Sequence, residues 1–246
     1  MGTIRLAGCG GRRKFESKGF YAPRKQRQTR HCYSVLIVKN VARILRWDRS
    51  GAIVTAAIEY DREGELAEFL RRFSKAPPAM REVDETVTTP AVSDALEARK
   101  ELNVAEDVRM FEMEVPSLTS DEKLWLIVPA PTALGYSPPG RWTQGFTSYD
   151  PVGKRKVYLK DTWRLDLEGI EPEGETYKLL HEKGVRNIPQ CLAGGDVLVA
   201  KHHATRTNEY RGMEWGWAPR KLSLNPHQHY RLVLGVVGAK LMECGS

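Results

Sequence analysis

"GRWTQGFTSYDPVGKRKVYLKD", residues 140–161, is the stretch that decides the fold of this chain. Residues 146–149 are a short run rich in β-forming side chains, and residues 156–160 are a second such run. Asp150-Pro151-Val152-Gly153 lies between them, and Asp, Pro and Gly are the residues that favour tight turns. The pattern therefore predicts a β-hairpin.

Lys160 ends the apolar run of this second strand and is followed at once by Asp161. A lysine on a strand that faces a core needs a counter-charge, because an unpaired buried cation is costly. On the pattern alone, a solvated lysine at a strand end is the simpler interpretation. The question is whether the chain supplies a partner for Lys160.

The next segment, "IEPEGETYKLLHEKG" at residues 170–184, predicts a helix. Acidic residues occupy its first turn, as the helix dipole favours, and Gly184 suits the C′ position. Glu173 shares a helix face with Tyr177, so it is the favoured partner for Lys160. Glu175 points about 200° away around the helix and is the alternative. Either glutamate also fits a role confined to the helix dipole.

The rest of the chain predicts further strands and helices in an α+β order. Residues 35–38, 41–47 and 52–58 form a three-stranded meander, and apolar residues at helical spacing follow between Leu66 and Phe73. The other predicted elements are a helix that begins at Thr89-Pro90, a strand at 124–128, a strand pair or bent strand from residue 188, a polar insertion at about 201–226, and an apolar strand from His229 to Gly238.

The Pro-rich stretch "PAPTALGYSPPG" predicts a linker at 129–139. This divides the chain into a small α+β segment at 32–128 and a second unit at 140–246. Residues 1–31 hold nine Lys or Arg and one acid, a net charge of +8. Since the whole chain carries +7, residues 32–246 carry −1. We expect 1–31 to be a basic, disordered tail.

The composition of the chain indicates in which cellular compartment we expect the protein. No apolar run reaches the ~20 residues that a membrane-spanning helix needs, and no signal peptide is evident. The four cysteines, Cys9, Cys32, Cys191 and Cys244, form no CxxC pair, which favours free thiols. We expect a soluble intracellular protein, cytoplasmic or nuclear, without membrane contact. The histidines match no zinc-site spacing, so no metal site is predicted.

Gly140 and Gly145 have the GxxxxG spacing of a phosphate-binding P-loop. The lysine that should follow is Phe146, and a strand rather than a helix comes next. Without that cation and without a helix N-terminus to face the phosphates, a P-loop is excluded.

Protein kinases bind ATP differently. They cover its phosphates with a glycine-containing hairpin and hold them with a strand lysine, which a glutamate on the next helix orients. The runs "KVYLKDTWR", "EGIEPEGETYKLLHEKGV", "IPQCLAGGDV" and "HYRLVLGVVG", together with "RWDRSGAIVT" and "EFLRRF", resemble the fungal-type protein kinase family over most of residues 30–242.

The resemblance implies a protein-kinase-like N-lobe, an antiparallel sheet plus one helix, at 140–246, preceded by the α+β segment and the basic tail. It implies ATP and Mg²⁺ as cofactors of the full-length family and a protein Ser/Thr substrate. The nucleotide-binding residues it implies are Gly140, Gly145, Lys160 with Glu173 or Glu175, and a hinge at Val236, Val237 and Gly238.

The catalytic half of a kinase has no counterpart in this sequence. These 246 residues contain no HRDxxxxN-like or DFG-like run, so we expect no catalytic residues here and weak or no ATP binding. The expectation is a kinase-family fragment that is inactive alone and truncated after the hinge. Two alternatives remain: a regulatory fragment or pseudokinase that pairs with a chain carrying a C-lobe, and a nucleic-acid-binding protein that acts through residues 1–31.

Overall fold

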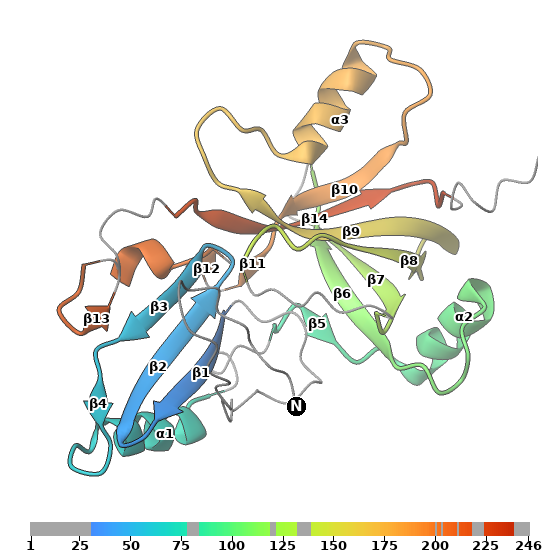
Figure 1. Cartoon of the computed structure of the whole chain (residues 1–246). Helices are drawn as coiled ribbons and strands as arrows, with labels where there is room; N and C mark the ends of the chain where they lie inside the picture. Colours follow the sequence, from blue (N-terminus) through green and yellow to red (C-terminus); the bar gives the residue numbers. More distant parts are fainter. Residues whose placement is uncertain are drawn as a thin grey trace, which may run out of the picture.

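Two large antiparallel β-sheets, a two-stranded sheet and three α-helices make up most of the described part of the protein, in a computed structural model (Figure 1). The structure describes residues 31–77, 84–118, 122–131, 139–199, 201–202, 204–210, 212–217 and 224–238. The architecture is therefore mixed α+β, as the sequence predicts. The expected tail lies outside the described residues, except for His31, which begins the first strand.

The first sheet is built on the predicted meander. Its strands are β1 (His31–Val38), β2 (Val41–Asp48), β3 (Gly51–Thr55), β4 (Ile58–Glu59) and β13 (Gly216–Trp217). The order is β1-β2-β3-β13, and β4 also pairs with β2. β13 comes from the polar insertion, so a segment more than 150 residues downstream completes this sheet.

Helix α1 (Glu65–Lys75) packs on this first sheet. Buried Leu66 meets Ala42 and Ile58 in a small core. Next to it, the ring of Tyr33 makes edge contacts with Phe69 and Phe73. The apolar spacing that predicts the helix therefore also determines the face that it buries.

The second sheet has seven strands in the order β10-β14-β9-β8-β7-β6-β5. Its strands are β5 (Val87–Thr88), β6 (Met110–Pro116), β7 (Lys123–Pro129), β8 (Gln144–Asp150), β9 (Arg155–Leu165), β10 (Cys191–Asp196) and β14 (His227–Leu234). The short strands β11 (Leu198–Val199) and β12 (Lys201–His202) pair with each other, and a 3₁₀ helix spans Thr207–Tyr210.

The seven-stranded sheet curls, so that β6 on one side packs against β10 and β14 on the other. Its inner face holds the main apolar core, to which β6, β7, β8, β9, β10 and β14 all contribute. Helix α2 (Val92–Leu102) covers part of the outer face, where Ala98 meets Ile127 and Tyr149. Helix α3 (Glu173–Glu182) stands on another part of the outer face (Figure 1).

The expected division at 129–139 does not separate two packing units. β7 and β8, on either side of it, are neighbours in one sheet, where Ile127 pairs with Tyr149. The apolar core of that sheet contains Leu126 from one side and Leu159 from the other. Residues 84–118 therefore belong with residues 139–199, because they share one core, whereas residues 31–75 form most of the first sheet and its helix. Residues 132–138 of the linker lie outside the described part.

Other expectations differ in detail. Helix α2 begins at Val92 after an Ala91 cap, two residues beyond the expected Pro90 start. Strand β6 is absent from the sequence prediction, although apolar and acidic residues alternate along it. Gly184 has a φ of +67° just after α3, so the expected C′ glycine is confirmed. No helix within the described ranges is long and apolar enough to cross a membrane.

Candidate functional site

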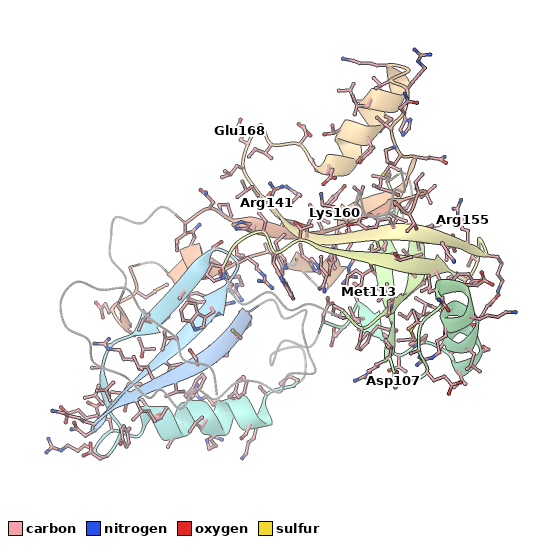
Figure 2. The ribbon with its side chains drawn as sticks, turned by 45° about the vertical axis from the view of Figure 1, so that its right-hand side comes forward. Asp107, Met113, Arg141, Arg155, Lys160 and Glu168 are labelled. Atoms are coloured by element: carbon pink, nitrogen blue, oxygen red, sulfur yellow. The ribbon has the colours of Figure 1, made fainter. Side chains whose placement is uncertain are left out.

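Lys160 and Glu173 form an ion pair between β9 and the first residue of α3. Lys160 Nζ lies 2.5 Å from Glu173 Oε2. The lysine points to the outer, α3 side of the sheet, whereas Met113 lies on the opposite side (Figure 2). The side chains are 26% and 36% exposed. The ion pair is therefore a feature of the outer face, within reach of solvent, and not a core charge.

The first turn of α3 is fixed directly on β14, which places Glu173. The backbone N–H of Gly174 donates to the hydroxyl of Tyr230 at 2.9 Å. A Cβ at Gly174 would lie only 2.5 Å from that same oxygen, so a larger residue there would lift the helix from the sheet. Burial raises the pKa of Tyr230, so this hydroxyl stays neutral at physiological pH.

Glu175, the alternative partner, is directed elsewhere. It forms an ion pair with Lys178 on its own helix, at 3.9 Å. Of the two glutamates that the sequence leaves open, the structure places Glu173 on Lys160.

A second ion pair lies on the same face of β9. Arg164 donates to both carboxylate oxygens of Asp196 at 2.7 Å. This paired geometry is the strong form of an arginine–carboxylate contact, and the hydrogen bond to Asp196 raises the pKa of Arg164. Lys160 and Arg164 are four residues apart, so their side chains leave the strand on one face. The outer face thus carries two cations, each oriented by a carboxylate.

Gly145 pairs with Lys160 across β8 and β9. A Cβ at Gly145 would fall inside the van der Waals radius of the Tyr158 hydroxyl oxygen and 2.7 Å from ring carbon Cζ. The phenol ring of Tyr158 therefore lies over the glycine. The structure gives Gly145 a packing role beside Lys160, which a glycine that only closes a turn would not have.

The other expected nucleotide residues lie away from this pair. The β8–β9 turn is residues 151–154, whereas Gly140 precedes β8 at the far end of the hairpin. Gly140 has a φ of +106°, and its N–H donates to the Arg49 carbonyl at 2.9 Å. The two glycines are therefore not the hairpin loop. Because Leu232 pairs with Lys160 and Leu234 with Tyr158, the segment Val236–Gly238 follows β14 at the turn end.

A buried charge cluster inside the curled sheet is absent from the sequence prediction. Arg231 on β14 is fully buried, and its guanidinium donates to Asp84 at 3.1 Å and to the Thr86 hydroxyl at 2.9 Å. Asp161 lies beside it and pairs with His229 at 2.5 Å. Burial raises the pKa of Asp161, but the nearby charges of His229 and Arg231 outweigh that effect and lower it to about 2. Two features of the sequence could have indicated this cluster. Arg231 interrupts the apolar run of β14, and Asp161 directly follows the apolar run of β9.

Aromatic side chains connect this buried charge cluster with the first sheet. The imidazole of His229 stacks on Trp163, with ring centroids 5.0 Å apart. The guanidinium of Arg49, in the β2–β3 turn, lies 4.4 Å from the Trp142 ring centroid and 5.9 Å from that of Trp163. Burial lowers the pKa of Arg49 to about 10, which still leaves it charged at neutral pH. Arg49 therefore joins the two sheets by cation–π contacts.

The described residues show no group of three or more His, Cys, Asp or Glu placed to hold a metal ion. Cys32 and Cys191 are free thiols, and burial raises the pKa of both, to about 11 for Cys191. Neither thiol is therefore activated as a thiolate nucleophile.

Comparison with known proteins adds no relative: no family model, no curated protein and no solved structure matches this chain. The likeness to fungal-type protein kinases, and the nucleotide-binding roles that it implies, therefore stay predictions. The functional proposal therefore rests on the geometry of the outer face.

Proposed function

We propose that the outer face of the seven-stranded sheet, together with α3, is a kinase-like nucleotide-binding surface in which Lys160 holds phosphate oxygens. The observation that carries this proposal is the 2.5 Å ion pair of Lys160 with Glu173. A lysine on a strand oriented by a glutamate on the following helix is the pairing with which protein kinases hold the ATP phosphates.

The chemistry of the pair fits a phosphate ligand. An ammonium group has three N–H donors. One N–H of Lys160 is directed at Glu173. Because the Lys160 side chain is partly exposed, its other two N–H groups can donate to phosphate oxygens. Charge-assisted bonds of this kind are about twice as strong as neutral ones. Among the described residues no group of three or more His, Cys, Asp or Glu is placed to hold a metal ion, so Mg²⁺ would be held mainly by the nucleotide phosphates.

The proposal is for binding and not for turnover. Phosphoryl transfer depends on positioning and on charge stabilisation by a base and metal-holding carboxylates. The sequence contains no HRD-like or DFG-like run to supply them. We expect MgATP to bind with a Kd on the order of 1 mM, about −4 kcal/mol, because the ligand would contact one wall only.

Titration of the full chain with MgATP, followed by ligand-observed NMR, tests the proposal. Lys160→Gln removes the cation, and we expect it to weaken binding about tenfold or more, since a charged hydrogen bond contributes roughly 1.5–3 kcal/mol. Glu173→Gln should weaken binding less, because it removes only the orientation of the lysine. The matched control is Lys156→Gln, an exposed lysine on the same strand. No saturable binding, or equal binding by the Lys160 and Lys156 variants, would overturn the proposal.

A further inference from the structure

Two hollows lie against α3, on either side of Glu175. The first, of about 300 Å³, is lined by Glu171, Glu175, Thr176, Lys178, Leu179 and Glu182. The second, of about 210 Å³, lies at the foot of the helix and is lined by residues that include Pro172, Glu175, Asp196 and Tyr230. Glu175 lines both hollows, and we call the two together the α3 groove.

The α3 groove is acidic beyond what the helix itself requires. Glu171 and Glu175 suit the N-terminal end of a helix dipole, but Glu182 is the last helical residue, where the dipole disfavours a carboxylate. Within the described ranges, no cation forms an ion pair with Glu171 or Glu182. Lys178 is the lysine in the lining of the first hollow, and it pairs with Glu175, so Glu171 and Glu182 are left to meet a cation from outside the helix.

Helix α3 and the residues at its two ends also present exposed apolar side chains. It projects from the sheet, and Gly174 in its first turn is its buried residue (Figure 1). Leu179 in the groove is 49% exposed, and Ile170 and Val185 at the two ends of the helix are 44% and 43% exposed. An acidic groove with apolar contacts is suited to a basic segment that also carries large apolar side chains.

We propose that the α3 groove binds the basic N-terminal segment of this same chain, residues 1–30. The segment holds nine Lys or Arg against one Glu, and Phe15, Phe20 and Tyr21 lie among them. The remaining residues carry a net charge of −1, so almost all of the excess positive charge of the chain is in this segment. Charge complementarity of this kind steers and orients association.

The covalent connection of residues 1–30 to β1 favours their contact with the α3 groove. The segment joins β1 at His31, which pairs with Asp48 next to the β2–β3 turn. Ser50 in that turn donates to the Asn225 carbonyl, two residues before β14. Thirty residues span up to about 100 Å when extended, which exceeds the size of the folded part. A tethered ligand within reach has an effective concentration in the millimolar range, so weak ion pairs suffice.

Zero-length carbodiimide cross-linking of the full chain tests this proposal, because it joins lysine amines directly to carboxylates. We expect peptides that link Lys14, Lys18 or Lys25 to Glu171, Glu175 or Glu182. The triple variant E171Q/E175Q/E182Q should reduce the yield of tail-to-core links at least fivefold. The matched control E101Q/E106Q/D107N removes three exposed acids at the end of α2 and should leave the yield unchanged. Raising the salt from 0.05 to 0.5 M should weaken the links, since exposed charges are screened.

An equimolar mixture of ¹⁴N- and ¹⁵N-labelled chains shows whether the links form within one chain. Links that carry mixed labels would overturn the proposal in favour of association between copies. Links to other acids, or yields equal in the groove and control variants, would also overturn it. If the segment binds an RNA oligonucleotide while the groove substitutions leave its cross-links unchanged, the segment is a nucleic-acid ligand and the proposal fails. Nucleotide binding at Lys160 is not required for any of these outcomes.

Discussion

His229 Nε2 lies 2.5 Å from Asp161 Oδ1 between β9 and β14, where the side chains are 3% and 8% exposed. Arg231 Nε approaches the same oxygen at 3.4 Å, and its other end pairs with Asp84. A fully buried arginine is tolerated only where carboxylates compensate it. Asp161 therefore pairs with two buried side chains, His229 and Arg231, and we expect the stability of the curled sheet to depend on this carboxylate.

Asp161→Asn should lower the free energy of unfolding by about 3–5 kcal/mol, because it leaves Arg231 and His229 without their shared carboxylate. Urea denaturation followed by tryptophan fluorescence measures this, since Trp163 stacks on His229. The control is Asp166→Asn, which removes a half-exposed carboxylate 3.4 Å from Arg164. That change should cost less than about 1 kcal/mol. Equal losses in the two variants would contradict the role assigned to Asp161.

The lowered pKa of Asp161 predicts how stability depends on pH. Its folded pKa is about 2, below the ordinary aspartate pKa of 3.8, so its contribution is fully present above pH 4. The contribution is lost as the pH falls toward 2, and we expect stability to drop by roughly 2 kcal/mol on that account. Carboxyl ¹³C titration of the folded protein should place the inflection of Asp161 near pH 2. An inflection near 4 would show that the buried cations do not stabilise the carboxylate.

Local sequence patterns predicted the elements that neighbouring residues determine. The β1–β3 meander, α1, the β8–β9 hairpin and the Gly184 end of α3 all follow from turn chemistry and apolar spacing within a few residues. The ion-pair partner Glu173 was found because the apolar face of the next helix must turn toward the sheet. These features need no knowledge of distant contacts.

Long-range pairing could not be predicted in this way. The place of β14 between β9 and β10, and of β13 beside β3, depends on segments far apart in the chain, and β7 pairs with β8 across the Pro-rich stretch. A Pro-rich stretch between two strands therefore indicated a domain boundary where the structure has one sheet. The Arg231 cluster was missed for the same reason, because Asp84 and Arg231 meet only after the sheet has curled.

Gly145→Ala should destabilise the protein by about 1–3 kcal/mol, the usual cost of overpacking. The added methyl group would meet the hydroxyl and ring of Tyr158. Tyr158→Ala should relieve the clash, so the double variant should lose less stability than the two single changes added together. Gly64→Ala is the control, since a Cβ there meets nothing within 4 Å. Thermal unfolding of the four variants measures the coupling, and strict additivity would show that Tyr158 does not lie over Gly145.

The Lys160–Glu173 pair should contribute little to stability. Its side chains are 26% and 36% exposed, and ion pairs this accessible contribute about 0.2–1 kcal/mol. A double-mutant cycle with Lys160→Gln and Glu173→Gln, read by urea denaturation, should give a coupling within that range. Any larger loss of MgATP binding in Lys160→Gln would then arise from the missing cation, because the sheet and α3 remain folded. A coupling above about 3 kcal/mol would instead make the pair a structural bridge, and the proposed phosphate role would lose its main support.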